Sequence, residues 1–114
     1  MKNRTNLRLL TGWRVNEILL SSGENGATPV AQGVTLQPRQ HTSNATILTI
    51  KAKKEVILSA GWLHTPQILQ RSGIGPSSVL KNAGIKQVVD LPGVGSNLQD
   101  HAGIKSQHQC KLFN

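Results

Sequence analysis

Short apolar runs separated by polar or glycine-rich stretches fill the first half of the chain. Residues 7–10 and 15–20 read as extended segments, and residues 30–36 alternate loosely between apolar and polar positions. Residues 46–50 alternate regularly, which is typical of a half-buried strand. Gly33 lies inside the third run, and a glycine there indicates a bulge or a close approach of another backbone. The pattern therefore predicts an antiparallel meander.

The pattern changes at residues 55–59, where three consecutive apolar residues stand at 56–58. Such a run is typical of a parallel-type strand that is covered on both faces. Ala60 and Gly61 follow it directly. A strand that turns at a glycine into a helix presents bare backbone N–H groups to a ligand, as dinucleotide-binding proteins do. The sequence therefore predicts a buried strand that leads into a candidate nucleotide site.

Two short helices are predicted after this junction. Thr65 suits the N-cap position, and Pro66 suits the first helical position because the N–H that proline lacks is not needed there. This helix runs to about Arg71 and ends at Gly73. Residues 77–82 are expected to form the second helix.

The rest of the second half predicts little regular structure. Gly84 is expected just beyond the second helix, and residues 87–90 suggest a brief strand. Residues 91–101 are rich in Gly, Pro and Asn, so an irregular path is expected. The predicted fold class is α/β, an α+β fragment with an antiparallel meander, one buried parallel-type strand and short helices.

Length and charge narrow the class of protein. A chain of 114 residues is long enough for one domain and not two. Its net charge of +8 could indicate nucleic acid or an anionic membrane as partner. The basic residues are scattered, however, and aromatic residues make up only 3%, which leaves little material for base stacking. A solvated basic surface is therefore favoured over a nucleic-acid-binding module.

Cysteine content and hydropathy add few constraints. Cys110 is the single cysteine, so an internal disulfide is excluded. His101, His108 and Cys110 are close in sequence, but they lack a fourth ligand and a recognisable metal-site spacing. No apolar run approaches the roughly 20 residues needed to span a bilayer, and no signal peptide is visible. We expect no metal site and no membrane partner, and the compartment stays unassigned.

Three blocks of the chain are more specific than these patterns. Residues 59–76 read SAGWLHTPQILQRSGIGP, and residues 91–101 read LPGVGSNLQDH. The first block closely resembles the second signature of the glucose–methanol–choline (GMC) family of flavin-dependent oxidoreductases, and the second block matches the segment that follows it. Residues 6–7 and 10–15 resemble the adenine-side strand of the same family. The three blocks stand in the family's order and cover roughly residues 5–101.

The resemblance implies a cofactor, a reaction and a domain division. Residues 1–101 would form part of an FAD-binding GMC-type domain, and residues 102–114 a tail that leads toward a substrate domain. The family oxidises the CH–OH group of a small-molecule alcohol and passes the hydride to FAD. The backbone of Val15 would contact the adenine end of FAD, and Ala60 and Gly61 would lie against the cofactor, where a Cβ at the glycine would push it outward.

Other positions in the blocks receive an interpretation from the same resemblance. Thr65 completes the set of candidate cofactor-binding residues. Trp62 stands where the family usually has a small residue, so it either crowds the cofactor or turns outward. His64 is interpreted as a residue that makes a local hydrogen bond rather than as a catalytic base. Three polar residues of the second block are expected to tie down the loop: Asn97, Asp100 and His101.

Two parts of the family pattern are missing from the sequence. No Gly-x-Gly-x-x-Gly turn for the FAD pyrophosphate is present, and no C-terminal histidine pair that would take the alcohol proton. We therefore expect a truncated GMC-type alcohol oxidase or dehydrogenase with no catalytic residue of its own, inactive alone. The alternatives are a non-catalytic fragment that associates with another protein through its unpaired strand edges and, less favoured, a basic nucleic-acid-binding module.

Overall fold

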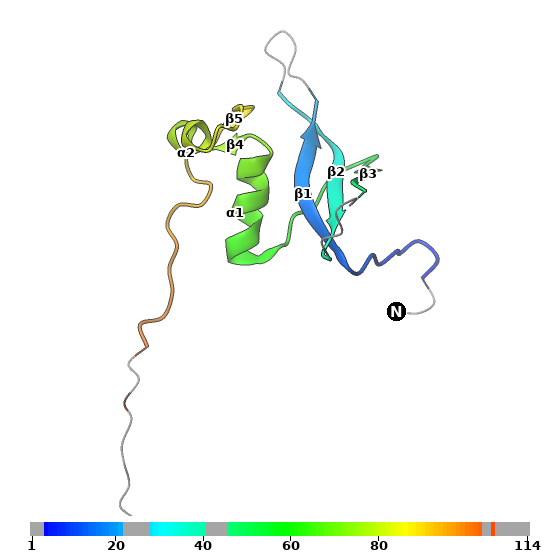
Figure 1. Ribbon diagram of the computed structural model, residues 1–114, viewed down its shortest axis with the longest axis horizontal. Helices are drawn as coiled ribbons and strands as arrows, with labels where there is room; N and C mark the ends of the chain where they lie inside the picture. The colour runs from blue at the N-terminus through cyan, green and yellow to red at the C-terminus, as the bar shows by residue number, and fades with distance from the viewer. Residues whose placement is uncertain (1–3, 22–27, 41–45, 104–105, 107–114) are drawn as a thin grey trace, which may run out of the picture.

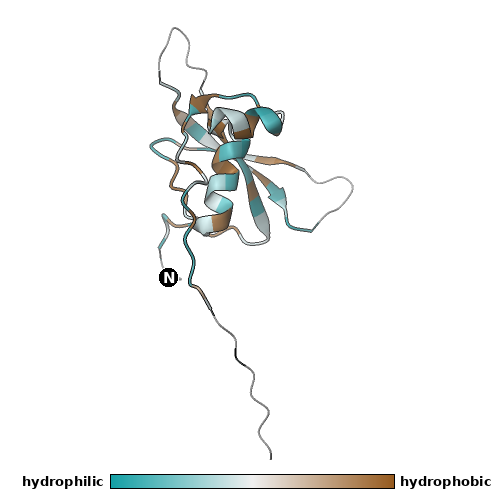
Figure 2. Ribbon diagram, turned by 90° about the vertical axis from the view of Figure 1, so that its left-hand side faces the viewer, coloured by the Kyte–Doolittle hydropathy of each residue, from teal (hydrophilic) through white to brown (hydrophobic). Residues whose placement is uncertain are grey.

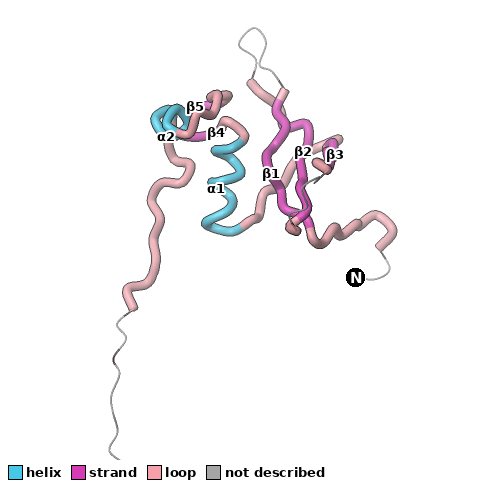
Figure 3. Tube along the Cα trace, in the orientation of Figure 1, coloured by secondary structure: helices cyan, strands magenta, loops and turns pink. Residues whose placement is uncertain are grey.

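A computed structural model describes residues 4–21, 28–40, 46–103 and 106 of the chain. The elements follow the order β1 (Trp13–Leu20), β2 (Ala31–Pro38), β3 (Leu48–Lys51), α1 (Gly61–Arg71), β4 (Ile74–Gly75), α2 (Ser77–Asn82) and β5 (Val89–Asp90). A three-stranded sheet lies on one side of α1, and a small unit of β4, α2 and β5 lies at the C-terminal end of that helix (Figure 1). A loop joins β3 to α1, and a long loop follows β5 (Figure 3).

The predicted antiparallel meander is confirmed. The sheet has the order β1-β2-β3, with both pairs antiparallel. The ladder between β1 and β2 shifts register around Asn16, because Val15 faces Leu36 whereas Glu17 faces Thr35. Residues 7–10, expected to be extended as well, belong to no strand, and their apolar side chains are exposed.

Gly33 explains how closely β2 and β3 approach each other. It faces Lys51, and a Cβ at this glycine would overlap the carbonyl oxygen of Ile50 and lie 2.9 Å from the Cα of Lys51. A side chain at this position would therefore force the two strands apart. The close backbone approach predicted from the glycine is present.

One face of the sheet is apolar, and it is covered unevenly. Val34 pairs with Ile18 on one side and with Ile50 on the other, and side chains of directly paired residues share a face. Ile18 is buried, whereas Leu48 and Ile50 of β3 are 37% and 38% exposed. The reason is that α1 packs on β1, at the opposite edge of the sheet. The predicted half-buried strand is thus an exposed edge strand, and apolar and polar residues are mixed along the strands and α1 (Figure 2).

Residues 55–59 differ most from the sequence-based prediction. They form no strand, and Ile57 is 78% exposed while Val56 and Leu58 are half-buried. Three consecutive apolar residues signal two covered faces, but a strand also needs ladder partners, and none of the described residues pairs with this segment. The parallel pairing occurs elsewhere, between β4 and β5. The α/β class with short helices and an antiparallel sheet is nevertheless confirmed.

Helix α1 begins four residues before the predicted N-cap. Its first residue is Gly61, its N-cap is Ala60, and Pro66 lies inside it. The hydroxyl of Thr65 accepts a hydrogen bond from the Ala60 N–H at 3.1 Å, so it caps the helix from within rather than from the N-cap position. The predicted end is correct, because Ser72 is the C-cap and Gly73 follows it with a φ of +81°.

The smaller unit follows the predictions except for one strand. Helix α2 has the predicted bounds, and Gly84 adopts a φ of +68° just beyond it. Strand β5 falls within the predicted residues 87–90, whereas no strand was predicted at the position of β4. No helix within the described ranges combines the length and apolar composition needed to cross a membrane.

Candidate functional site

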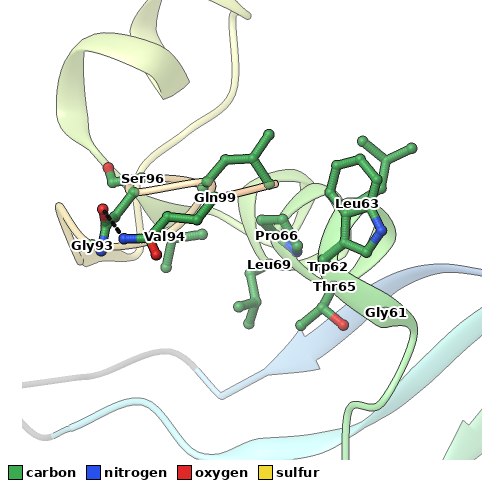
Figure 4. A pocket seen from close by; sticks show the side chains of 13 residues that line it. Gly61, Trp62, Leu63, Thr65, Pro66, Leu69, Gly93, Val94, Ser96 and Gln99 are labelled. Carbon is green, nitrogen blue, oxygen red and sulfur yellow. Dashed lines mark hydrogen bonds between the residues drawn. The ribbon is translucent and has the colours of Figure 1, made fainter. Parts of the chain in front are cut away.

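A cleft of about 730 Å³ lies between the N-terminal half of α1 and the segment that follows β5 (Figure 4). Pockets of about 300–1,000 Å³ are typical of small-molecule and cofactor sites. Residues 93–99, here named the glycine wall, form one side of the cleft. The other side comes from α1 and consists of Gly61, Trp62, Leu63, Thr65, Pro66 and Leu69.

Large apolar side chains make up much of the cleft lining. Trp62 is 69% exposed and lines the cleft, and it also lines a smaller adjoining pocket with Leu98. The indole therefore borders the cleft, and the choice between crowding the cofactor and turning outward stays a prediction. Leu63 and Leu98 are exposed as well. An aromatic ring beside aliphatic side chains suits a flat, partly apolar ligand.

The N-terminus of α1 opens onto the cleft. Gly61 has a φ of +84°, and a Cβ at this position would have no neighbouring atom within 4 Å. The backbone conformation, not crowding, requires glycine here, and its missing side chain leaves the backbone open to the cleft. The first N–H groups of a helix lack intrahelical partners, and the first turn of α1 carries no acidic residue. This end of the cleft is thus suited to an anionic or carbonyl group.

The four predicted cofactor-binding residues occupy different places. Gly61 and Thr65 line the cleft, and Ala60 adjoins it as the N-cap of α1. Val15 lies in β1, outside the cleft lining, where its carbonyl accepts a hydrogen bond from Arg71 Nη2 at 3.4 Å. The structure thus brings three of the residues together at one end of α1, and the role of all four stays a prediction.

The glycine wall is the part of the cleft that the sequence reading did not assign to the site. Its conformation depends on two residues with positive φ, Gly95 at +78° and Asn97 at +57°. The hydroxyl of Ser96 donates to the Pro92 carbonyl at 3.0 Å, and the Ser96 N–H donates to the Gly93 carbonyl at 3.2 Å. The repeated glycines of this segment were the available signal, because they permit the turns that bend it against α1.

The polar residues of the second block make local contacts. Gln99 Nε2 donates to Asn97 Oδ1 at 3.4 Å, and Asp100 Oδ1 accepts from the His101 N–H at 2.8 Å. Both contacts join residues only one or two positions apart, so the expected role of these side chains in tying down the loop stays a prediction. His64 is exposed on α1 and lies outside the cleft lining.

Of the three candidate metal ligands, the structure describes only His101. His108 and Cys110 lie outside the described residues. Among the residues that are described, no group of three or more His, Cys, Asp or Glu side chains could hold a metal ion.

Comparison with known proteins assigns this arrangement to a family. The family model for GMC oxidoreductase matches residues 1–103. The chain belongs to the GMC oxidoreductase family. A GMC oxidoreductase family protein of Malassezia sympodialis, Mala s 12, is 48% identical over 103 residues, which are 89% of this chain and 16% of that protein. Alcohol oxidase of Pichia angusta is 37% identical over 101 residues, 89% of this chain and 15% of that protein.

Solved structures agree with this assignment. An FAD-dependent oxidoreductase from Chaetomium thermophilum superposes with a TM-score of 0.76 at 42% identity, covering 87% of this chain and 16% of that chain. Pyridoxine 4-oxidase from Mesorbium loti gives a TM-score of 0.64 at 34% identity, covering 80% and 16%. The GMC chain therefore spans less than a fifth of the length of these relatives. The matches confirm the resemblance read from the motifs, the fold class, and FAD as the cofactor.

Proposed function

We propose that this GMC chain forms part of the FAD site of an oxidoreductase that oxidises the CH–OH group of a small alcohol. The cleft between Gly61 and the glycine wall is the observation that carries the proposal. Both sides of this cleft come from the two blocks that resemble the family, residues 59–76 and 91–101. The names of the relatives, alcohol oxidase and oxygen-dependent choline dehydrogenase, support an alcohol as the substrate class.

The residues of the cleft fit a dinucleotide. The helix start at Gly61 offers backbone N–H groups without a side chain in the way. The exposed indole of Trp62 offers an aromatic surface, and the volume of the cleft lies in the usual range for a cofactor site. Ala60, Gly61 and Thr65 would hold the cofactor from α1, with the backbone of Val15 as a further contact. FAD would supply the hydride-accepting chemistry.

The domain division follows from the same reasoning. Residues 1–101 would form part of the FAD-binding domain, and residues 102–114 would lead toward a substrate domain. The residues of this chain contribute binding and orientation, because its sequence offers no histidine pair to take the alcohol proton. We propose that the 114-residue chain alone neither retains FAD tightly nor oxidises alcohols.

A graft into a full-length relative tests this function. Residues 1–103 would replace the matching segment of the Malassezia protein, and flavin content and alcohol-dependent acceptor reduction would be measured beside the parent. Retained flavin and activity would support the proposal. A folded graft that lacks flavin while the parent holds it would overturn the cofactor role. Stoichiometric, tightly held FAD on the 114-residue chain alone would overturn the proposed incompleteness.

A second candidate function, association with another protein, has its own support. Ile57 is exposed in a segment that pairs with no strand among the residues that the structure describes, and β3 exposes Leu48 and Ile50 along the outer strand of the sheet. Edges of this kind bind other strands readily. This second function would be favoured if the chain binds a protein partner and the graft that carries residues 1–103 holds no flavin.

A further inference from the structure

Gln70 connects helix α1 to the glycine wall on the side that faces away from the cleft. Its Nε2 donates a hydrogen bond to the carbonyl oxygen of Val94 at 3.3 Å, across 24 positions of sequence. Val94 is buried and lines the cleft, whereas Gln70 lines a separate pocket on the side of α2. The glutamine thus holds the wall without reaching the cleft itself.

Two glycines leave room for this side chain. A Cβ at Gly95 would lie 2.9 Å from Gln70 Nε2, and a Cβ at Gly75 would lie 3.1 Å from Gln70 Cγ. Both distances are shorter than ordinary carbon contacts, so a side chain at either glycine would displace the glutamine. Gly75 is buried in β4 and Gly95 belongs to the glycine wall. One side chain of α1 is therefore fitted against two separate segments of the chain, β4 and the glycine wall.

We propose that Gln70 is a positioning residue that fixes the glycine wall against α1 and thereby sets the width of the cofactor cleft. The part of this inference that concerns the cofactor rests on the proposed function. The positioning role itself concerns only this chain, because both ends of the hydrogen bond and both glycines belong to it.

Amide hydrogen exchange on the 114-residue chain tests the positioning role. Gln70→Leu keeps the bulk of the side chain but loses the donor, and Gln70→Glu keeps the shape but places a carboxylate against the Val94 carbonyl. The amides of Val94 and Ser96, which bond to Leu91 and Gly93, report on the wall. Loss of the Gln70–Val94 hydrogen bond should speed the exchange of these two amides about fivefold. Gln70→Glu should accelerate their exchange at least as much as Gln70→Leu does.

The matched control is Gln67→Leu, on the same helix and beside the same rear pocket. It should leave the wall amides unchanged. The Ser72 amide, which bonds to the carbonyls of α1, should keep its protection in every variant. Unchanged wall amides, or equal acceleration at Ser72 and at the wall, would overturn the proposal, because Gln70 would then have no specific effect on the wall.

The cofactor readout uses the grafted enzyme. Gln70→Leu should raise the Kd for FAD about fivefold relative to Gln67→Leu, with the KM for the alcohol unchanged. If the unsubstituted graft holds no flavin, the proposed function fails, and the exchange experiment still decides the role of Gln70. If the graft binds FAD and Gln70→Leu binds it equally well, the inference about cleft width fails while the proposed function stands.

Discussion

The hydroxyl of Ser72 joins helix α1 to strand β1 through the backbone of Ile18. Ser72 Oγ accepts a hydrogen bond from the Ile18 N–H at 2.8 Å and donates one to the Ile68 carbonyl at 2.7 Å. All three residues are buried. Because β1 is an edge strand of the three-stranded sheet, this bond satisfies a backbone group that the ladder leaves open. The relationship also fixes where α1 lies relative to the sheet.

Ser72→Ala should therefore destabilise the chain clearly. The substitution leaves the buried Ile18 N–H without a partner, which costs about 1–3 kcal/mol. Urea unfolding monitored by circular dichroism would measure the loss. Ser78→Ala, at an exposed position in α2, is the control and should stay within about 0.5 kcal/mol of the unsubstituted chain. Equal stability of the two variants would show that water replaces the Ser72 hydroxyl.

Gly33→Ala should disrupt the meander between β2 and β3. The added methyl group would overlap the Ile50 backbone, and backbone atoms cannot move aside as a flexible side chain can. We expect a loss of stability of about 1–3 kcal/mol or more, with faster amide exchange in β3. Gly93→Ala is the control, because a Cβ there meets no atom within 4 Å. A Gly33→Ala variant with unchanged β3 protection would mean that the two strands accommodate the methyl group without separating.

Gly61 and Gly84 form a matched pair for testing the site. Both adopt positive φ, +84° and +68°, and a Cβ at either would meet no atom within 4 Å. Gly61→Leu and Gly84→Leu should therefore lose similar stability, about 1–2 kcal/mol, through backbone strain. In the grafted enzyme, only Gly61→Leu should weaken FAD retention, because Gly84 lies beyond α2 and outside the cleft lining. The ratio of bound flavin to protein after gel filtration would measure retention. Equal loss of flavin from the two variants would mean that Gly61 does not lie against the cofactor.

The sequence predicted the features that depend on local chemistry. The ends of both helices follow from Gly73 and Gly84, which supply the positive φ needed there, and the close approach at Gly33 follows from its missing side chain. The start of α1 was missed because Thr65 caps the Ala60 N–H from inside the helix, a geometry that resembles an N-cap in sequence.

Features that depend on distant partners were predicted less well. The cleft needs the glycine wall to lie against α1, and the Gln70–Val94 hydrogen bond that holds it joins residues 24 positions apart. The motif blocks identified both sides of the cleft as family segments, but they did not show that the two segments pack against each other. The run at 56–58 was read as a buried strand because its composition is typical of a strand with two covered faces. A strand also needs partners for its backbone hydrogen bonds, and those come from distant segments that the run itself does not specify.

Ile57→Lys tests whether the exposed segment makes the chain associate. Ile57 is 78% exposed within an apolar run that pairs with none of the described residues, so it offers a surface for strand pairing between molecules. The unsubstituted chain should show concentration-dependent sedimentation, and Ile57→Lys should shift it toward monomer with a change in stability within about 0.5 kcal/mol. Leu9→Lys adds the same charge at a position that is 85% exposed and outside any strand, so it separates charge repulsion from loss of the apolar contact. If both variants dissociate equally, the added charge and not residue 57 controls association; if neither does, the segment is not the contact surface.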